Sequence, residues 1–118
     1  MASTNKRLPA AFYKTESGGE PVREWLKSKA LSKEDRYRIG ADIKTIEFGW
    51  PIGMPTCGPL GNGLWEVRTT LANRTARILF SVHAGKMVLL HGFIKKTQRT
   101  PKEDLEIALD RKRRMEIE

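Results

Sequence analysis

The sequence contains one cysteine and two histidines among its 118 residues, and this scarcity excludes several kinds of site. Cys57 stands alone, so the chain cannot form an internal disulfide. No other cysteine or histidine lies near it in the sequence, so a structural zinc site is not expected. No base is close to it in the chain either, which argues against a catalytic thiol.

Long apolar runs are also missing. No segment approaches the ~20 consecutive apolar residues that a membrane-spanning helix needs. The first ten residues, MASTNKRLPA, have no apolar run after their charges, so a secretory signal is not expected. With 39% hydrophobic and 31% charged residues, the composition predicts one globular domain over residues 1–118, cytoplasmic and without membrane contact.

Acidic residues are absent from one long stretch. Between Glu66 and Glu103 there is no carboxylate, but there are eight cations. These are Arg68, Arg74, Arg77, Lys86, Lys95, Lys96, Arg99 and Lys102. The chain has 22 Lys plus Arg and 14 Asp plus Glu, so removing these eight leaves 14 of each sign. The net charge of +8 therefore resides in this stretch, and such a field favours a polyanion, most commonly nucleic acid.

The same stretch predicts three antiparallel strands, at residues 64–71, 74–83 and 87–94, joined by short turns. The third is apolar on both faces, which favours a central position. Alternation places Trp65, Val67, Thr69 and Leu71 on the face toward the helices, together with Ala76, Ile78, Phe80 and Val82. It places Leu64, Glu66, Arg68 and Thr70 on the opposite face, together with Arg77, Leu79 and Ser81. Pairing the first two strands as a hairpin would bring Arg68 and Arg77 together there.

The N-terminal half predicts one strand and two helices. Residues 8–14 suit an edge strand, because Pro9 cannot donate to a ladder. Pro21 opens the first helix, and Ser32 with Asp35 is close to a capping box that opens the second. The expected apolar stripes are Val22, Trp25, Leu26 and Ala30 in the first helix, and Ile39, Ile43 and Ile46 in the second.

The second helix should end at Phe48-Gly49, with Gly49 in the left-handed conformation. Residues 49–63 hold five glycines and three prolines, which predicts an irregular loop, either a plain crossover or a functional loop. Thr100 and Pro101 mark the start of a C-terminal helix. The expected architecture is α+β, with two helices on one face of a small, mostly antiparallel sheet and the nucleic acid on the other.

Three motifs in this order resemble the RelE/HigB superfamily, and most closely its phage-derived HigB-like branch. They are GLWEVR at 63–68, ARILF at 76–80 and LLHGFIKKTQRTP at 89–101. The resemblance covers nearly the whole chain and implies a RelE-like fold. It also implies the toxin of a type II toxin–antitoxin pair, which cleaves mRNA, typically on the ribosome, without a metal or other cofactor. The implied partners are mRNA, the ribosome and a cognate antitoxin with a helix-turn-helix DNA-binding domain, in a hetero-oligomer.

The resemblance implies catalytic roles for Arg68, Arg77, Lys95 and Lys96. Both arginines can stabilise a phosphorane, and either lysine, with its pKa lowered by neighbouring cations, can act as base or acid. The wider set expected to bind RNA comprises Glu66, Arg74, Lys86, Thr97, Gln98 and Arg99.

Several alternatives stay open. Glu66 is either a second candidate base or a partner that fixes Arg68, and the two arginines can simply pair with Glu66 and C-terminal carboxylates on a wet sheet face. His91 in mid-strand is more typical of a hydrogen-bonded core residue than of a catalyst. The general base is not assigned. Rival functions are a basic RNA-binding module without catalysis and an interaction protein that docks an acidic antitoxin segment.

Overall fold

The computed structural model of the protein describes residues 5–52, 57–95 and 100–117. Within these residues, five strands form one mixed sheet in the order β1-β5-β4-β3-β2. The strands are β1 (Ala10–Phe12), β2 (Cys57–Gly61), β3 (Leu64–Thr70), β4 (Thr75–His83) and β5 (Lys86–Lys95). The helices are α1 (Pro21–Leu26), α2 (Lys33–Gly49) and α3 (Lys102–Ile117). Only β1 and β5 pair in parallel among these strands, so the α+β class is confirmed.

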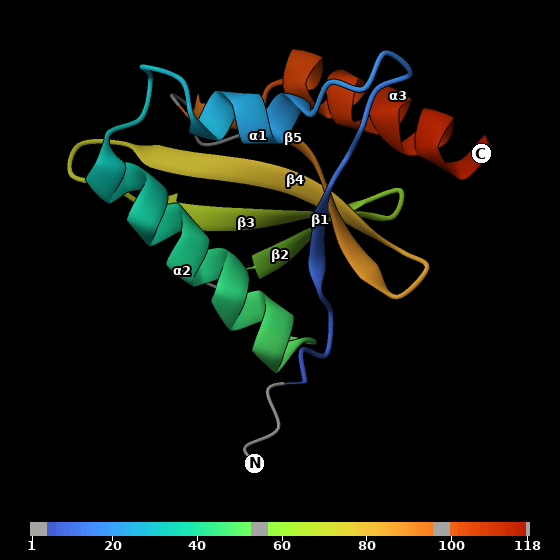
Figure 1. The fold of residues 1–118 in the computed structure, drawn as a ribbon, viewed down its shortest axis with the longest axis horizontal. Coiled ribbons are helices and arrows are strands. Elements are labelled where there is room, and N and C mark those ends of the chain that lie inside the picture. The colour runs from blue at the N-terminus through green and yellow to red at the C-terminus, as the bar shows by residue number, and fades with distance from the viewer. Residues whose placement is uncertain (1–4, 53–56, 96–99, 118) are drawn as a thin grey trace.

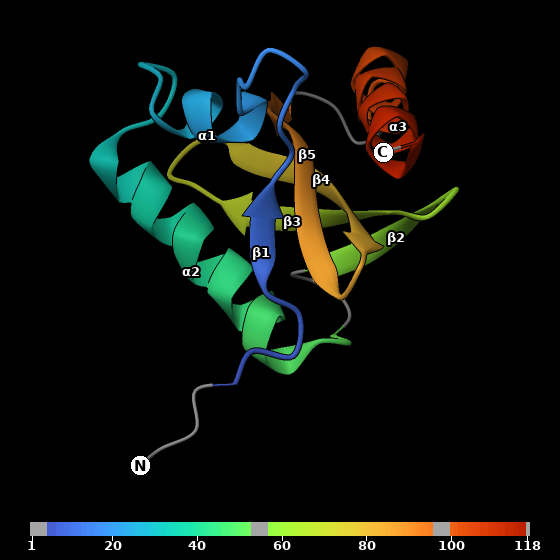
Figure 2. The same cartoon turned by 45° about the vertical axis from the view of Figure 1, so that its right-hand side comes forward.

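Helices cover both faces of the sheet (Figures 1 and 2). On one face, α1 and α2 enclose a core that includes Val22, Ile39 and Phe80. On the other, α3 packs its Ala108 into a second core with Leu64, Leu79, Val88 and Leu90. The expectation of two helices on one face is confirmed by α1 and α2, whereas the C-terminal helix, which the sequence did not assign to a face, covers apolar strand residues on the other. A functional surface on this second face is limited to the part that α3 leaves open.

The N-terminal edge strand is confirmed, although β1 is only three residues long. It pairs with β5, which lies between β1 and β4, so β5 is interior while β4 occupies the middle of the sheet. Pro9 lies just before β1 and contributes its carbonyl, which accepts a hydrogen bond from Met87 N at 2.8 Å. This interior position explains why β5 is apolar on both faces.

The prediction of an irregular loop over residues 49–63 is wrong for its second half. Residues 57–61 form β2, an edge strand antiparallel to β3 with a register shift between Pro59 and Gly61. Proline is tolerated on such an edge, where its missing donor leaves no ladder bond unmade. Cys57 is fully buried there, and this burial, with the nearby Glu66 carboxylate, raises the pKa of its thiol to about 11. The thiol is therefore inert.

The helix starts follow the sequence closely. Pro21 opens α1, and at the start of α2 the Asp35 amide donates to Ser32 Oγ while the Ser32 amide donates to Asp35 Oδ2, both at 3.0 Å. Ala30, however, lies beyond the end of α1 and is exposed, so it forms no part of an apolar stripe. The third helix begins at Lys102, one residue later than expected.

The end of α2 differs from the expectation in conformation rather than in position. The helix stops at Gly49 as predicted, but the residue that closes it is Trp50, with φ −56° and ψ 137°. Gly49 is not among the described residues with positive φ, so the left-handed stop is wrong. Trp50 instead turns into the core, where its ring meets Trp65 edge-on at 4.9 Å and Phe80 at 5.9 Å.

We predict that Gly92→Ala lowers the free energy of unfolding by about 1–3 kcal/mol. A Cβ at this position of β5 would lie 2.5 Å from Trp25 Cε3, so α1 would have to move away from the sheet. The matched control is Gly40→Ala on α2, where a Cβ meets nothing within 4 Å and should stabilise by about 0.5–1 kcal/mol. Urea denaturation measures both; equal effects would refute the close packing of α1 on β5.

Candidate functional site

A bulge in β5 decides which side chains face α3. Leu79 pairs with His91 and Phe80 pairs with Leu89, so Leu90 is an extra residue on β5. Because one extra residue reverses the alternation, the residues beyond it change faces. Leu90 packs in the α3-side core, while Gly92, two positions on, lies against Trp25 of α1 on the opposite face.

The bulge brings cations of three strands together on the α3 side of the sheet. Arg68 of β3 lies directly opposite Arg77 of β4, as the hairpin prediction required. Arg77 lies opposite Phe93, and Thr75 opposite Lys95 of β5. We refer to Arg68, Arg77 and Lys95 as the cationic cluster. It lies at the end of the sheet where α3 begins.

One carboxylate, Glu66, holds both arginines. Its Oε2 lies 3.1 Å from Arg68 Nη2, and its Oε1 lies 2.7 Å from Arg77 Nη1. The side chains of Glu66 and Arg77 are only 3% and 4% exposed, whereas that of Arg68 is 35% exposed. The sequence left open a solvent-exposed sheet face on which both arginines pair with carboxylates. In the structure, Glu66 and Arg77 form a buried ion pair, and only the Arg68 guanidinium of the three groups is accessible. With Lys95 nearby, three positive charges meet one negative charge, so the described part of the cluster keeps an excess of positive charge.

Arg77 is fixed from a second direction by the segment that leads into α3. Its Nη1 donates to Thr100 Oγ1 at 2.8 Å. Its Nε has no hydrogen-bond partner among the described residues, although buried polar atoms are nearly always paired. Burial lowers the pKa of Arg77, and Arg68 lowers it further, while Glu66 opposes both. An arginine keeps its charge under any such shift, so Arg77 is a rigid cation with a spare donor.

Lys95 is half-buried at the edge of the cluster. Partial burial lowers its pKa, the charges of Arg77 and Arg68 lower it further, and Glu66 opposes them. Because all the lowering causes disfavour the ammonium form, this lysine loses its proton more readily than an exposed lysine does. A lysine in this state is suited to exchange a proton with a bound substrate.

His91 is held in place rather than open to a ligand. Its Nε2 lies 2.6 Å from Asp104 Oδ1 on α3, and its Nδ1 lies 3.5 Å from Arg111 Nη1. Arg111 Nη1 also donates to the Leu90 carbonyl at 2.8 Å, and the His91 ring stacks on Phe93. With both ring nitrogens engaged, His91 joins α3 to β5 next to the cationic cluster. Its place as a hydrogen-bonded structural residue agrees with the plainer of the two sequence interpretations.

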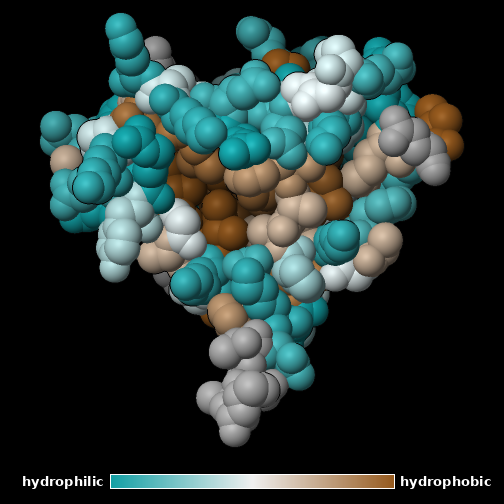
Figure 3. All heavy atoms as spheres, in the orientation of Figure 1, coloured by the Kyte–Doolittle hydropathy of each residue, from teal (hydrophilic) through white to brown (hydrophobic). Residues whose placement is uncertain are grey.

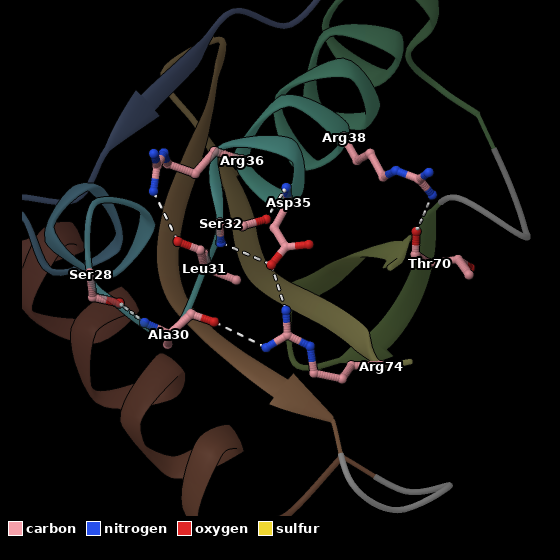
Figure 4. A network of polar contacts seen from close by, with 9 residues as sticks. All are labelled: Ser28, Ala30, Leu31, Ser32, Asp35, Arg36, Arg38, Thr70 and Arg74. Carbon is pink, nitrogen blue, oxygen red and sulfur yellow. Dashed lines mark hydrogen bonds and ion pairs between the residues drawn. The ribbon is translucent and has the colours of Figure 1, made fainter. Parts of the chain in front are cut away.

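Two basic residues predicted to bind RNA lie away from the cluster. Arg74 points to the opposite side of the sheet, where it donates to the Asp35 carboxylate and, at 3.0 Å, to the Ala30 carbonyl (Figure 4). Lys86 begins β5 and lies nine positions before Lys95, which corresponds to roughly 30 Å along a strand. Arg74 therefore ties the start of α2 to the β3–β4 turn, and Lys86 belongs to another surface.

The remaining predicted residues, Lys96, Thr97, Gln98 and Arg99, lie outside the described residues, and their roles stay predictions. The sequence analysis missed Thr100 and the Asp104 contact. Thr100 was interpreted as a helix cap, and no local pattern reports that Arg77, 23 residues earlier, reaches it. The sequence assigned no face to the residues of the third strand, so the placement of Phe93 beside Arg77 was not predicted; a bulge leaves no clear sequence signal.

The family model described as "Phage derived protein Gp49-like (DUF891)" matches residues 24–113. The chain belongs to this family. Gp49-like proteins are toxin-like members of the RelE/HigB-like toxin superfamily, and a toxin of this kind implies an antitoxin partner. The match includes every described residue of the cationic cluster. No curated protein matches the chain.

Two further features are absent from the described residues. No group of three or more His, Cys, Asp and Glu side chains among them is arranged to hold a metal ion. None of the helices in residues 5–52, 57–95 and 100–117 combines the length and apolar character needed to cross a membrane.

We predict that Arg68→Gln raises the pKa of Lys95. The substitution removes a like charge that disfavours the ammonium form, while Glu66 stays paired with Arg77. An NMR titration of the Lys95 side-chain nitrogen in both proteins measures the shift, with exposed Lys86 as the internal control. An unchanged Lys95 titration would show that the two cations do not share one electrostatic site.

Proposed function

We propose that this Gp49-like protein is the toxin of a type II toxin–antitoxin pair and an endoribonuclease that cleaves mRNA on the ribosome. One observation supports the proposal above all. Arg68 and Arg77 share the single carboxylate of Glu66, and Lys95 lies beside them. Three cations that converge on one anion leave a charge excess that a phosphate diester would neutralise.

The proposed reaction is attack of an RNA 2′-OH on its own 3′-phosphate. The 2′-oxygen forms a bond to phosphorus as its proton leaves, the bond from phosphorus to the 5′-oxygen breaks, and that oxygen takes up a proton. The products are a 2′,3′-cyclic phosphate and a 5′-OH end. The protein must stabilise the extra negative charge on the nonbridging oxygens and move two protons.

The residues of the cationic cluster differ in solvent exposure, and we assign their roles accordingly. Arg68 is accessible and can donate charge-assisted hydrogen bonds to a nonbridging oxygen. Arg77 lies beneath it, locked by Glu66 and Thr100, and contributes a fixed positive potential and an Nε donor that has no partner among the described residues. Because it is preorganised, this charge needs no rearrangement as the transition state forms. Lys95, with its lowered pKa, is the candidate for proton transfer.

Glu66 is the weaker candidate for the base. Its carboxylate is buried, and each oxygen lies against a guanidinium. We assign it a positioning role, in which it sets the separation and direction of the two arginines. The antitoxin, with a helix-turn-helix DNA-binding domain, would then restrain the toxin in a hetero-oligomer, and the net charge of +8 would favour association with ribosomal RNA.

A non-catalytic RNA-binding module is the second candidate. The observation that favours it is the state of His91, whose two ring nitrogens both face protein groups. Arg68 and Lys95 alone can bind phosphate without cleaving it. The two candidates differ in the fate of the RNA.

We predict that Arg68→Ala reduces mRNA cleavage by about 100-fold or more, because one donor to the developing charge is lost. Mapping of mRNA 5′ ends after induced expression measures it, with growth arrest and its relief by the neighbouring gene's product as parallel measurements. Arg68 is preferable to Arg77, whose removal would leave Glu66 buried without its closest partner.

Arg113→Ala is the control for the loss of an arginine, since Arg113 is 70% exposed on α3 and its ion-pair partner among the described residues is Asp110. Cleavage at the wild-type level is expected for this control. Intact mRNA in cells that express the wild-type protein, together with tight RNA binding in vitro, would support the binding module and contradict the nuclease.

We also predict that RNA affinity falls steeply with salt, because phosphate contacts release counterions. Lys95→Gln should reduce the slope of log affinity against log salt by about 1. Lys29→Gln, on the exposed corner between α1 and α2, should leave the slope unchanged. Filter binding of a single-stranded RNA over a range of salt concentrations measures all three. An unaltered slope for Lys95→Gln would remove this lysine from the site.

A further inference from the structure

The outer edge of β1 has backbone groups without a strand beside them. Tyr13 N donates to the Leu89 carbonyl at 3.0 Å, and the Pro9 carbonyl accepts from Met87 N, so residues 9 and 13 direct their groups toward β5. Ala11 follows the same alternation and also faces β5, so the groups that point the other way are the N–H and C=O of Ala10 and Phe12. Ala10 N donates a hydrogen bond to Glu47 Oε2 at 2.6 Å, whereas Phe12 N has no such side-chain acceptor among the described residues.

A cleft of about 290 Å³ opens beside β1 on the α3 side of the sheet. Its apolar lining comes from β1 and the residue after it, from β5 and from the last turn of α3. Its basic lining comes from the segment that follows β1 and from the adjoining ends of β4 and β5. The lining residues include Tyr13, Val88 and Met115, and the basic Lys14, His83 and Lys86. Among the described residues, no carboxylate lines it. The cleft is therefore apolar at its base and positive at its rim.

A second depression lies on the opposite side of the same strand. Figure 3 shows a hollow with hydrophobic atoms at its centre, enclosed by hydrophilic residues, in the region bounded by α1, α2 and β1 in Figure 1. The half-buried apolar side chains that α1 and β1 contribute to this side are Ala10, Phe12, Trp25 and Leu26. The open edge of β1 is thus bordered by an apolar hollow on one face and by a basic cleft on the other.

We propose that an extended, acidic segment of a partner protein adds a strand to the outer edge of β1. Its backbone would bond to Phe12 and its neighbours. Its alternate side chains would fall on opposite faces, apolar ones in the hollow between α1 and α2 and acidic ones toward Lys14 and Lys86. The identity of this partner as the antitoxin rests on the proposed function; the docking itself does not.

The charge and chemistry of the site favour an acidic peptide over RNA and over a second copy of the chain. RNA has no backbone amides to continue a strand ladder, and the hollow between α1 and α2 is apolar. A second copy of the chain would bring its own net charge of +8 to a rim that is already basic. Of these three, only an acidic peptide has a backbone that can bond to the edge of β1, apolar side chains for the hollow and negative charges for the basic rim.

The proposed docking edge is far from the cationic cluster. The cleft lies at the Lys86 end of β5 and the cluster at the Lys95 end, roughly 30 Å apart along the strand. A partner strand at β1 would therefore leave the cluster uncovered. Inhibition through this contact would need either a second segment of the partner or steric exclusion from the ribosome.

The test uses the full chain and a fluorescein-labelled nine-residue peptide of alternating glutamate and valine, followed by fluorescence anisotropy. Phe12→Pro removes the outward N–H without touching a bond to β5, and should weaken binding at least ~10-fold. Lys14→Glu with Lys86→Glu should do the same, since both side chains are exposed and the rim becomes acidic. The second variant keeps the test valid should the proline disturb folding.

The matched control carries Lys29→Glu and Lys33→Glu, which change the net charge equally at exposed positions elsewhere, and should alter binding less than ~2-fold. A peptide with lysine in place of glutamate should not bind. Three results would each overturn the proposal. The two double variants could weaken peptide binding equally, or the Phe12 and Lys14 amide signals could shift with oligouridylate and not with the peptide. The third result is dimerisation of the free chain. Because no RNA is needed for peptide binding, a chain that binds the peptide but cleaves no mRNA would contradict the proposed function alone.

Discussion

The Glu66 carboxylate, shared between Arg68 and Arg77, is the interaction on which the site depends. A buried carboxylate without partners would be costly, and so would a buried guanidinium. Pairing solves both problems for Glu66 and Arg77, which are almost fully buried. It also fixes Arg68 at the surface, where a substrate can reach it. The protein therefore maintains an excess of positive charge without leaving a charge buried and unpaired.

The rest of the fold brings other groups to this pair. The bulge at Leu90 turns Phe93 and Lys95 to the face of Arg77. The start of α3 supplies Thr100 to Arg77 and Asp104 to His91. Without α3, the apolar strip of the second core would be exposed, and Arg77 would lose one of its acceptors. The helix thus stabilises the sheet and completes the site in the same place.

Much of the fold could be predicted from local sequence signals. Pro21 and the Ser32–Asp35 capping box set the starts of α1 and α2, because both act within a single turn. The hairpin that pairs Arg68 with Arg77 followed from strand alternation and a short turn. Strand β2 was missed because its Gly and Pro content is typical of loops, although an edge strand tolerates both.

The site was harder to predict, since its contacts join residues far apart in the chain. Composition showed where the cations gather, and pairing of Glu66 with the arginines was one of the alternatives, but no sequence pattern showed that Glu66 and Arg77 would be buried together. Arg74 matched the pattern of an RNA contact, yet it bonds to Asp35, 39 residues earlier, on the other side of the sheet. Such long-range choices depend on helix packing, which no local pattern encodes.

The most direct test of a preformed phosphate site is an NMR titration with a dinucleotide that lacks the 2′-OH and so cannot be cleaved. The account predicts that the side-chain nitrogen signals of Arg68, Arg77 and Lys95 shift together and saturate at one affinity, while that of Arg74 stays in place. Signals that do not move, or that move for Arg74 and the cluster alike, would contradict a single built site.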